Sequence, residues 1–432
     1  QEEACGDGVT TTMLLCGALL LEADTLFRKG LHPLTLVDGY EIALATSLSQ
    51  SDSDASPVNE DKLLAVAETA LRGKVAEAAL DLFAPIIVEA LTIVSKNRDE
   101  ISAEHVSMKK IGTGSLSESR LVKGVVLRRR ILLDSLPNDI FNPKVACLDG
   151  DIKIREMTRD VEIKILEVEN LDSFIDAEMN RKNEILQSIV ESSAEVILCS
   201  GEVDQDILHM LRENGILVVG ELDSSELRNA SDSTGSRIVQ SPLEIDKGAL
   251  GLCGKVTWEK KQSSDEVEDI IRIEDCPNPS VVTIEVGGAG EVGTEEVIRG
   301  LHDSLRATSL AMNEELLPGA GSIHSRMARA VREASEKQGG RERLAMEAFA
   351  RALEAIPATL VENSGGEPLD RILELRAIPL GDDFNGISED GKICEVERTW
   401  HPRSVIENSL ESATETAMGI LRIDQVISAK GE

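Results

Sequence analysis

The sequence predicts a multi-domain α and α/β protein in which an α/β module is inserted into a helical domain. Its 432 residues are enough for about two to four domains. Helical periodicity dominates the start of the chain and returns at Glu295, whereas short β-branched runs separated by turns begin after about Val106. This order of helical, α/β and helical segments is expected when one domain interrupts another and the chain crosses the junction twice.

The first segment predicts long helices. Four apolar residues recur at spacings of four, four and three and give one apolar stripe: Leu15, Leu19, Ala23 and Leu26. We therefore expect a helix over residues 12–29. Gly30 is expected to end this helix, and Pro33 to open a second one that reaches Leu48.

The remaining elements follow from the same rules. Ser and Asp dominate residues 47–57, which predict a loop. Amphipathic patterns predict further helices over these ranges: 59–72, 75–96, 170–191 and 203–213. Short apolar runs predict strands over four others: 124–127, 144–148, 196–199 and 216–219. After Glu295 the helical period persists almost to the end, broken by an irregular Gly/Asp segment at 379–399.

The charge balance excludes several classes of partner. The chain has 45 Lys and Arg against 78 Asp and Glu, a formal net charge of −33, spread along its length. Nucleic-acid binding requires clustered basic residues, so we expect none. No uncharged stretch of about 18 apolar residues and no basic leader segment are present, so we expect no membrane partner. The acidity indicates either a surface suited to high salt or the ordinary tendency of a large soluble oligomer.

The seven cysteines are scattered at long intervals and include no CxxC pair. This spacing argues against both a zinc site and a disulfide framework. We therefore expect reduced, mostly buried cysteines and a soluble, cytoplasmic protein.

Residues 6–12 read GDGVTTT and run straight into the first helix. Glycines let the backbone approach a ligand closely, threonine hydroxyls hydrogen-bond phosphate oxygens, and free N–H groups at a helix start favour anions. Asp7 would repel a phosphate unless a cation lies between them, so Asp7 is a candidate Mg²⁺ ligand. The alternative is an ordinary Asp/Gly turn with a threonine N-cap.

A second glycine-rich segment, residues 288–293, matches GxGxxG after an apolar run. A dinucleotide site would require an acidic residue at the end of a second strand about 20 residues later. The pattern at Leu301 to Asn313 is helical instead, so we favour a glycine-rich hinge between a strand and a helix.

Asp303 lies on that helix, and the glycine-rich loop Pro318 to Gly321 follows it. A carboxylate that faces such a loop from a rigid helix can orient a water molecule for phosphoryl transfer. The alternative is a solvated helix residue. No HExxH or GxSxG motif is present, and no histidine pairs with a nucleophile at a recognisable spacing.

Taken together, these segments resemble the group II chaperonins, the family of the archaeal thermosome and the eukaryotic cytosolic chaperonin. GDGVTTT is similar to the family's GDGTT phosphate loop, and LHDSL at 301–305 to its xHDAL helix. The other matching segments are GLHPLTLVDGY at 30–40, TALRGK at 69–74, GVVL at 124–127, STGSRIV at 233–239, and the long signatures at 352–377 and 412–427.

The resemblance implies three domains. An equatorial ATP-binding domain would comprise residues 1–58 and 316–432, an intermediate hinge domain 59–121 and 284–315, and an apical substrate-binding domain 122–283. Residues from about 150 to 182 would form the apical helical protrusion that closes the chamber. Partners would be unfolded polypeptides and other chaperonin subunits in a double ring.

The resemblance also implies ATP and Mg²⁺ as cofactors. Catalysis would rest on Asp303, which orients the attacking water, and on Asp7, which binds the metal. Lys74 would sense the phosphate and report it to the hinge. The nucleotide-binding residues would be Gly6, Asp7, Gly8, Val9, Thr10, Thr11, Lys74, Gly319, Ala320, Gly321, Gly381 and Asp383.

Some positions depart from the family pattern. Val9 replaces the first threonine of GDGTT, Ala320 replaces the middle glycine of GGG, and the GxxEP segment is not recognisable near residues 397–402. The family's upstream phosphate loop and NDG aspartate are expected ahead of residue 6 and are absent from this sequence. A divergent subunit with weak or no ATPase activity, which acts in substrate binding or ring assembly, therefore remains the alternative to an ATP-driven one.

Overall fold

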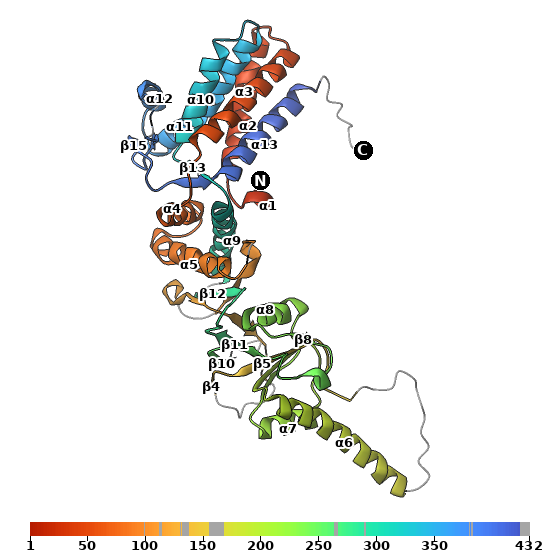
Figure 1. Cartoon of the computed structure of the whole chain (residues 1–432). Coiled ribbons are helices and arrows are strands. Elements are labelled where there is room, and N and C mark those ends of the chain that lie inside the picture. The colour runs from red at the N-terminus through yellow and green to blue at the C-terminus, as the bar shows by residue number, and fades with distance from the viewer. Residues whose placement is uncertain are drawn as a thin grey trace, which may run out of the picture. The chain divides into compact units, whose positions relative to one another are not determined.

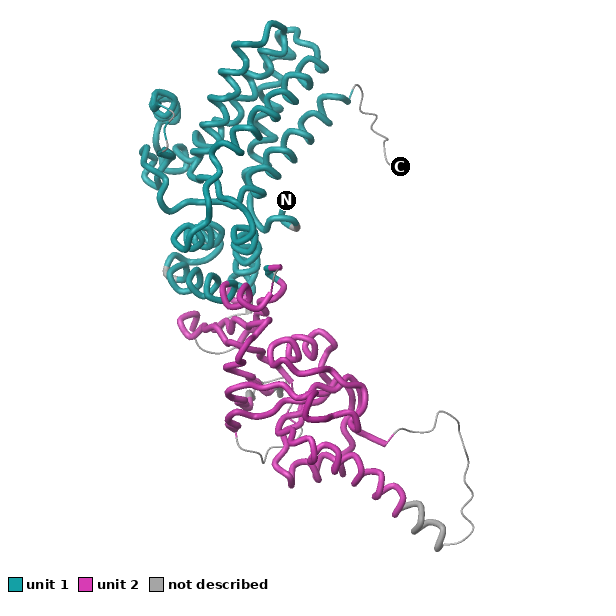
Figure 2. Tube along the Cα trace, viewed as in Figure 1, with its two compact units in different colours: residues 1–91, 101–103, 295–432 teal, residues 92–100, 104–294 magenta. Residues whose placement is uncertain are grey.

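The computed structural model describes residues 1–98, 100–111, 115–129, 131, 138–154, 168–262, 267–288, 291–379, 381 and 383–423 (Figure 1). The chain divides into two compact units (Figure 2). Unit 1 comprises Gln1–Leu91, Ile101–Ala103 and Glu295–Glu432, and unit 2 comprises Thr92–Glu100 and Glu104–Thr294. The mixed helical and α/β architecture is confirmed. The division into three domains stays a prediction.

Unit 1 contains a bundle of long helices: α2 (Val9–Arg28), α3 (Pro33–Asp54), α10 (Ser322–Ser335), α11 (Glu342–Asn363) and α13 (Arg403–Leu421). The apolar stripe of α2 is fully buried in it, as its spacing predicts. Tyr40 and Phe349 meet edge to face with ring centroids 5.5 Å apart. The buried Tyr40 hydroxyl donates to the Leu19 carbonyl at 2.8 Å, which satisfies the polar end of this core.

Shorter elements complete unit 1: α1 (Glu2–Cys5), α4 (Glu60–Leu71), α12 (Pro368–Ala377), β13 (Leu316–Pro318), β14 (Asn385–Ile387), β15 (Ile393–Glu395) and β16 (Trp400–Pro402). Two helices cross the unit boundary in the sequence, α5 (Glu77–Ser95) and α9 (Glu291–Asn313). β13 pairs antiparallel with β16, so that Leu317 lies opposite His401. The segment at 379–399, which we predicted to be irregular, includes a small hairpin of β14 and β15.

The predicted loop at residues 47–57 is wrong over most of its length, because α3 continues to Asp54. Ser47, Ser51 and Asp54 are buried at spacings of four and three, which is a helical stripe made of polar residues. Each has a partner: Ser47 donates to the Ala43 carbonyl, Ser51 to Glu407, and Asp54 accepts two bonds from Arg326. These bonds remove the cost of burying polar groups, so the helix does not need apolar residues there.

Unit 2 is built on a parallel sheet in the order β7-β6-β5-β8, with β9 antiparallel to β5. Its elements are β5 (Lys144–Leu148), α6 (Val168–Ser192), β6 (Val196–Cys199), α7 (Gln205–Glu213), β7 (Leu217–Val219), α8 (Ser224–Thr234), β8 (Ile238–Val239) and β9 (Gly251–Leu252). The central strands are buried on both faces, where two separate apolar clusters cover them. The predicted strands and helices of the α/β module are confirmed.

Two further sheets complete unit 2. One has the order β3-β11-β10-β4 and contains β3 (Val125–Arg128), β4 (Asp139–Phe141), β10 (Lys255–Gln262) and β11 (Val267–Glu274). The other has the order β1-β12-β2 and contains β1 (Val106–Lys110), β2 (Arg120–Val122) and β12 (Val282–Val286). Much of the predicted protrusion, residues 155–167 and the side chains of 168–175, lies outside the described residues.

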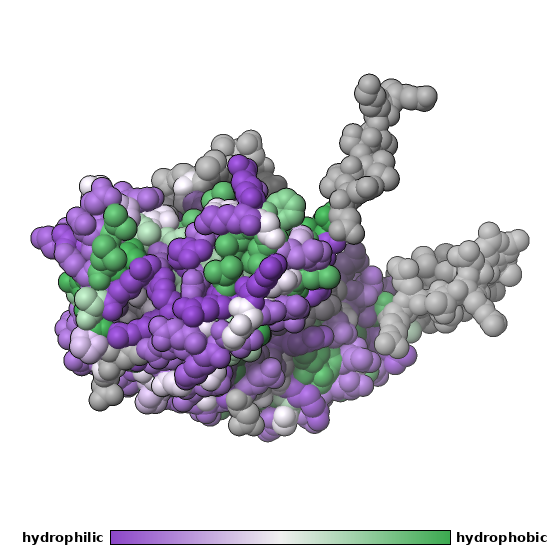
Figure 3. Space-filling model, turned by 90° about the horizontal axis from the view of Figure 1, so that it is seen from above, coloured by the Kyte–Doolittle hydropathy of each residue, from purple (hydrophilic) through white to green (hydrophobic). Residues whose placement is uncertain are grey.

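Hydrophilic residues cover most of the surface that Figure 3 shows, and hydrophobic residues form small patches between them. Within the described ranges, α2 is long and apolar enough to cross a membrane, but four of its apolar residues lie in the bundle core. All seven cysteines are free thiols, and five of them are buried. The prediction of mostly buried cysteines is confirmed.

Candidate nucleotide site

The GDGVTTT segment forms the N-terminus of α2. Gly6 ends α1 and Gly8 is the N-cap of α2, and both have left-handed backbone angles, φ 69° and φ 85°. The backbone N–H of Thr12 donates to the Gly8 carbonyl at 2.9 Å and starts the hydrogen-bond ladder of the helix. The N–H groups of the first helical turn, from Val9 to Thr11, therefore point out of the helix start and favour an anion.

Gly6 is favoured by the packing and by φ, whereas Gly8 is favoured by φ, because the atom nearest to a Cβ there is the movable amide of Gln1. A Cβ atom at Gly6 would lie 2.8 Å from the Asp303 carbonyl oxygen, and one at Gly8 would lie 2.6 Å from Gln1 Nε2. The absent side chains leave a cradle of bare backbone at the start of α2. A phosphate group fits such a cradle, because close approach to backbone N–H groups is what a phosphate loop provides.

Two carboxylates and one ammonium group meet beside this cradle. Lys74 Nζ lies 3.0 Å from Asp303 Oδ2 and 3.7 Å from Asp7 Oδ1. The Lys74 ammonium also donates to the Gly6 carbonyl at 3.5 Å. Asp7 and Asp303 are far apart in the sequence, and the fold brings them to one cation. Paired carboxylate oxygens of this kind are the donors that Mg²⁺ prefers.

These groups line a hollow of about 290 Å³, which we call the nucleotide hollow. Its lining residues are Glu2, Gly6, Asp7, Gly8, Val9, Thr10, Thr11, Lys74, Glu296, Arg299, Gly300 and Asp303. The structure thus brings together eight of the residues that the sequence singles out. Arg299 and Glu296 do not figure in the sequence analysis. Arg299 lies four residues before Asp303 on α9. Residues at this spacing share one face of a helix, so the sequence could have predicted that Arg299 lies beside Asp303.

The glycine-rich loop at 319–321 connects β13 to α10 and does not line the nucleotide hollow. The Gly319 N–H donates to the Thr399 carbonyl at 2.8 Å, and Gly321 is the N-cap of α10 at φ 73°. Ala320 has φ 54°, a left-handed angle that strains a residue with a Cβ atom. The family pattern has glycine at this position, so the substitution carries a backbone cost.

Gly381 and Asp383 also lie apart from the nucleotide hollow. The Gly381 carbonyl accepts a hydrogen bond of 3.1 Å from Arg326, and Asp383 lines a second hollow beside α10. Neither residue approaches Asp7 in any described contact. Their assignment to the nucleotide stays a prediction.

Sequence reasoning also missed two histidines. His401 Nδ1 lies 3.7 Å from Asp7 Oδ2, and burial lowers the pKa of His401 although the Asp7 carboxylate works against that shift. Burial and the nearby His401 lower the pKa of His324 to about 4. Both rings are therefore neutral at physiological pH. Only the pairing of β13 with β16 places His401 here, so no local sequence pattern could have found it.

The GxGxxG segment joins β12, which ends at Val286, to α9, which begins at Glu291. A Cβ atom at Gly288 would lie 2.4 Å from Thr294 Oγ1, so the close approach of the Thr294 side chain favours glycine at this position. Leu301 to Asn313 is helical, as predicted, and provides no second strand for a dinucleotide site.

Comparison with known proteins identifies the family. The model of the TCP-1/cpn60 chaperonin family matches residues 1–431. The chain belongs to this chaperonin family. Members of the family are ATPases. The resemblance to group II chaperonins is confirmed, and the chain is a group II chaperonin subunit.

Archaeal chaperonin subunits are among the relatives of this chain. It is 34% identical to thermosome subunit beta of Archaeoglobus fulgidus, over all of this chain and 80% of that protein. It is also 34% identical to thermosome subunit 1 of Haloferax volcanii, over 99% of this chain and 77% of that protein. The open-state monomer of a group II chaperonin from Methanococcoides burtonii has the same fold, with a TM-score of 0.65 and 24% identity, over 96% of this chain and all of that one.

Proposed function

We propose that this subunit binds Mg·ATP in the nucleotide hollow, hydrolyses it, and uses the reaction to drive the folding of polypeptides in a double ring in the cytoplasm. The observation that carries the proposal is the meeting of Asp7, Lys74 and Asp303 at the start of α2. A helix N-terminus, a cation-binding carboxylate and a second carboxylate for water are the parts that phosphoryl transfer requires.

Each residue has a separate task in this proposal. The first-turn N–H groups of α2 and the hydroxyls of Thr10 and Thr11 hold the phosphate oxygens. Asp7 would hold Mg²⁺, which would supply positive charge to neutralise the phosphates. Asp303 accepts a hydrogen bond from the attacking water and keeps it in line with the phosphorus atom. Lys74 exchanges its carboxylate partners for phosphate oxygens. Because Lys74 lies in the turn between α4 and α5, this exchange would move that turn when a nucleotide binds.

The remaining predicted residues complete the nucleotide contacts. The loop Gly319, Ala320 and Gly321 would approach the nucleotide through its backbone, and Gly381 and Asp383 would lie on its adenine side. The α/β unit would bind unfolded polypeptide, and hydrolysis would move it through the intermediate segments.

A second candidate is a subunit that binds substrates and neighbours but hydrolyses ATP slowly. Two observations favour it. Val9 occupies the first turn of α2 with 42% of its surface exposed and offers no hydroxyl to a phosphate. Ala320 strains the glycine loop at φ 54°. Retention of Asp303 beside Lys74 favours the active subunit.

Replacement of Asp7 by asparagine tests the proposal. Asp7→Asn should weaken binding of Mg·ATP much more than binding of ATP without metal, because the carboxylate acts through the cation. Calorimetric titrations with and without Mg²⁺ measure both affinities. Glu2→Gln, which removes a carboxylate from the same hollow, is the matched control and should change both affinities equally. An equal loss in the two titrations of Asp7→Asn would leave Asp7 as a turn residue and refute its role.

A further inference from the structure

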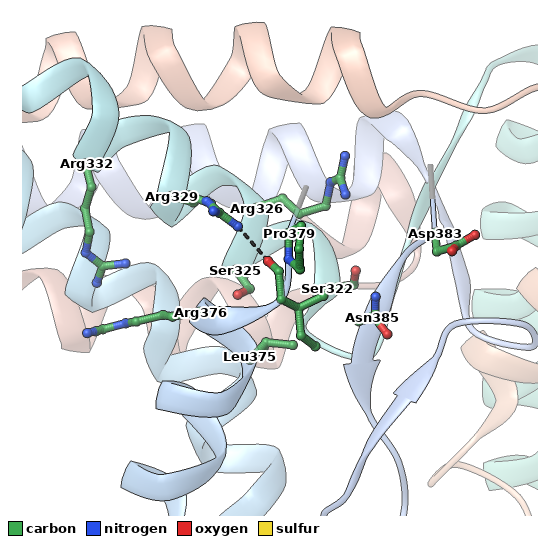
Figure 4. A pocket seen from close by; sticks show the side chains of 11 residues that line it. Ser322, Ser325, Arg326, Arg329, Arg332, Leu375, Arg376, Pro379, Asp383 and Asn385 are labelled. Atoms are coloured by element: carbon green, nitrogen blue, oxygen red, sulfur yellow. Dashed lines mark hydrogen bonds between the residues drawn. The ribbon is translucent and has the colours of Figure 1, made fainter. Parts of the chain in front are cut away.

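A second hollow of about 190 Å³ lies between α10, the C-terminal end of α12 and the segment that follows it (Figure 4). Four arginines line it: Arg326, Arg329, Arg332 and Arg376. The whole chain has only 45 basic residues among 432 and a net charge of −33. Four positively charged guanidinium groups around one small cavity are therefore unusual in a protein with such a large negative charge. We call this cavity the arginine hollow.

Among the described residues, only two of the carboxylates that face these four guanidinium groups are buried, Asp54 and Glu354. Arg326 is neutralised by Asp54, which accepts bonds of 2.8 and 2.7 Å. Arg332 and Arg376 share a single carboxylate, the buried Glu354. The single negative charge of Glu354 therefore balances only one of these two positive charges. We call this arrangement of Glu354 between two arginines the clamp. Carboxylates of this kind fix the guanidinium planes in position, which prepares them to bind a planar or tetrahedral oxyanion.

Arg329 adds a second positive charge. Its Nη1 donates to the Ile378 carbonyl at 2.7 Å, which holds the side chain against the hollow, as the dashed line in Figure 4 shows. Its described carboxylate partner, Glu333, is 3.6 Å away with 61% of its side chain exposed. Such a solvated pair contributes little. The carboxylate of Asp383 also lines the hollow and opposes an anion, but Asp383 is exposed to solvent, which screens its charge.

A buried hydroxyl group in the lining points to a ligand independently of the charge. Ser322 is fully buried and lines the arginine hollow. Its Oγ atom has no hydrogen-bond partner among the described residues. A buried hydroxyl without a partner costs roughly 1 to 3 kcal/mol, so a ligand oxygen within reach of the Ser322 hydroxyl would gain a hydrogen bond that offsets this cost.

We propose that the arginine hollow binds a small anion that carries phosphate or carboxylate groups. The volume is below that of pockets for drug-sized ligands, so the ligand has the size of pyrophosphate or of a small tricarboxylate. Arg329, Arg332 and Arg376 would contact its oxygens, and the Ser322 hydroxyl would donate to one of them. The two hollows share no lining residue, although the proposed function places Asp383 of the arginine hollow beside the adenine.

Calorimetric titration of the full chain with inorganic pyrophosphate, and separately with citrate, tests the proposal. Arg329→Gln should weaken binding about tenfold, the loss expected for one charge-assisted contact. Ser322→Ala should weaken it severalfold without lowering the unfolding temperature, because its hydroxyl has no described partner to lose. Arg343→Gln is the matched control, since Arg343 has the same i,i+4 pairing with a glutamate, Glu347, but lies outside the hollow. The loss caused by Arg329→Gln should persist in a Lys74→Ala background, in which the phosphate contacts of the nucleotide hollow are impaired.

Saturable binding of either probe with this order of losses supports the proposal, and the tighter probe identifies phosphate or carboxylate as the ligand chemistry. Equal losses in Arg329→Gln and Arg343→Gln would show a general charge effect and overturn it. A loss confined to Lys74→Ala would place the probe in the nucleotide hollow and also overturn it. Absence of saturable binding by both probes would do the same.

Discussion

Replacement of Asp303 by asparagine is expected to separate hydrolysis from nucleotide binding. In the proposed mechanism this carboxylate accepts a hydrogen bond from the attacking water, which becomes more acidic in the transition state. Loss of such a group costs roughly 10²- to 10⁴-fold in the rate of the chemical step. That range corresponds to about 3 to 5 kcal/mol of transition-state stabilisation.

The structure limits the accompanying change in binding. Without nucleotide, Asp303 pairs with Lys74 at 3.0 Å, and 15% and 31% of the two side chains are exposed. A partly exposed pair contributes about 1 kcal/mol at most. The dissociation constant of Mg·ATP should therefore change by about fivefold or less, far less than the rate.

Single-turnover hydrolysis and equilibrium Mg·ATP binding, both on the full chain, measure the two quantities. Glu296→Gln is the matched control, because Glu296 lies two turns earlier on α9 and lines the same hollow. Its rate should remain within a few fold of the unmodified chain. If Asp303→Asn loses rate and affinity by the same factor, Asp303 is a structural residue. If its rate is unchanged, the water is oriented by another group.

Three further predictions concern stability and the α/β unit. Glu354→Gln should destabilise unit 1 by about 2 kcal/mol in urea unfolding, because it leaves two partly exposed guanidinium groups without their buried carboxylate. Burial alone would raise the pKa of Glu354, but hydrogen bonds from Arg376 and Arg332 hold that pKa below its usual value. The loss of stability in Glu354→Gln should therefore be complete above about pH 4.3, the pKa of an unperturbed glutamate, and should disappear as the pH falls through the lower pKa of Glu354 in the folded chain. A loss of stability that does not change with pH would show that the charge of Glu354 does not stabilise the two arginines. Ala320→Gly should stabilise the chain by about 1 kcal/mol in the same assay, because φ 54° suits glycine, and no gain would mean that the loop carries no strain. Residues 122–283, expressed alone, should give a folded circular dichroism spectrum and bind a labelled unfolded polypeptide without ATP; an unfolded spectrum would refute these boundaries.

The helical stripe of α2 could be predicted from the sequence because four apolar residues at helical spacing have one physical explanation. The end of α3 could not be predicted in that way, because its buried face is polar. Ser51 and Asp54 are buried because Glu407 and Arg326 meet them from other helices. A rule that assigns Ser and Asp to loops has no access to partners hundreds of residues away.

The candidate site also combines features that the local sequence predicts with features that depend on distant residues. The glycines and threonines of residues 6–12 form a local pattern, and the structure keeps them together at one helix start. The meeting of Asp7 with Asp303 has no local signal, and only the resemblance to a family could connect them. The place of His401 depends on the pairing of β13 with β16, which composition and spacing do not encode.

The contact of Lys74 with both carboxylates has a consequence for the order of ligand binding. The Lys74 ammonium group is an internal counter-ion of Asp7 and Asp303, the two carboxylates to which the proposed function assigns the metal and the water. A free divalent cation must displace it without compensation, whereas a cation that arrives with phosphates offers the ammonium a new anionic partner. Under the proposed function, metal and nucleotide would therefore be thermodynamically linked, and each would raise the affinity for the other. Lys74 would then protect the nucleotide hollow against stray divalent cations that arrive without a nucleotide.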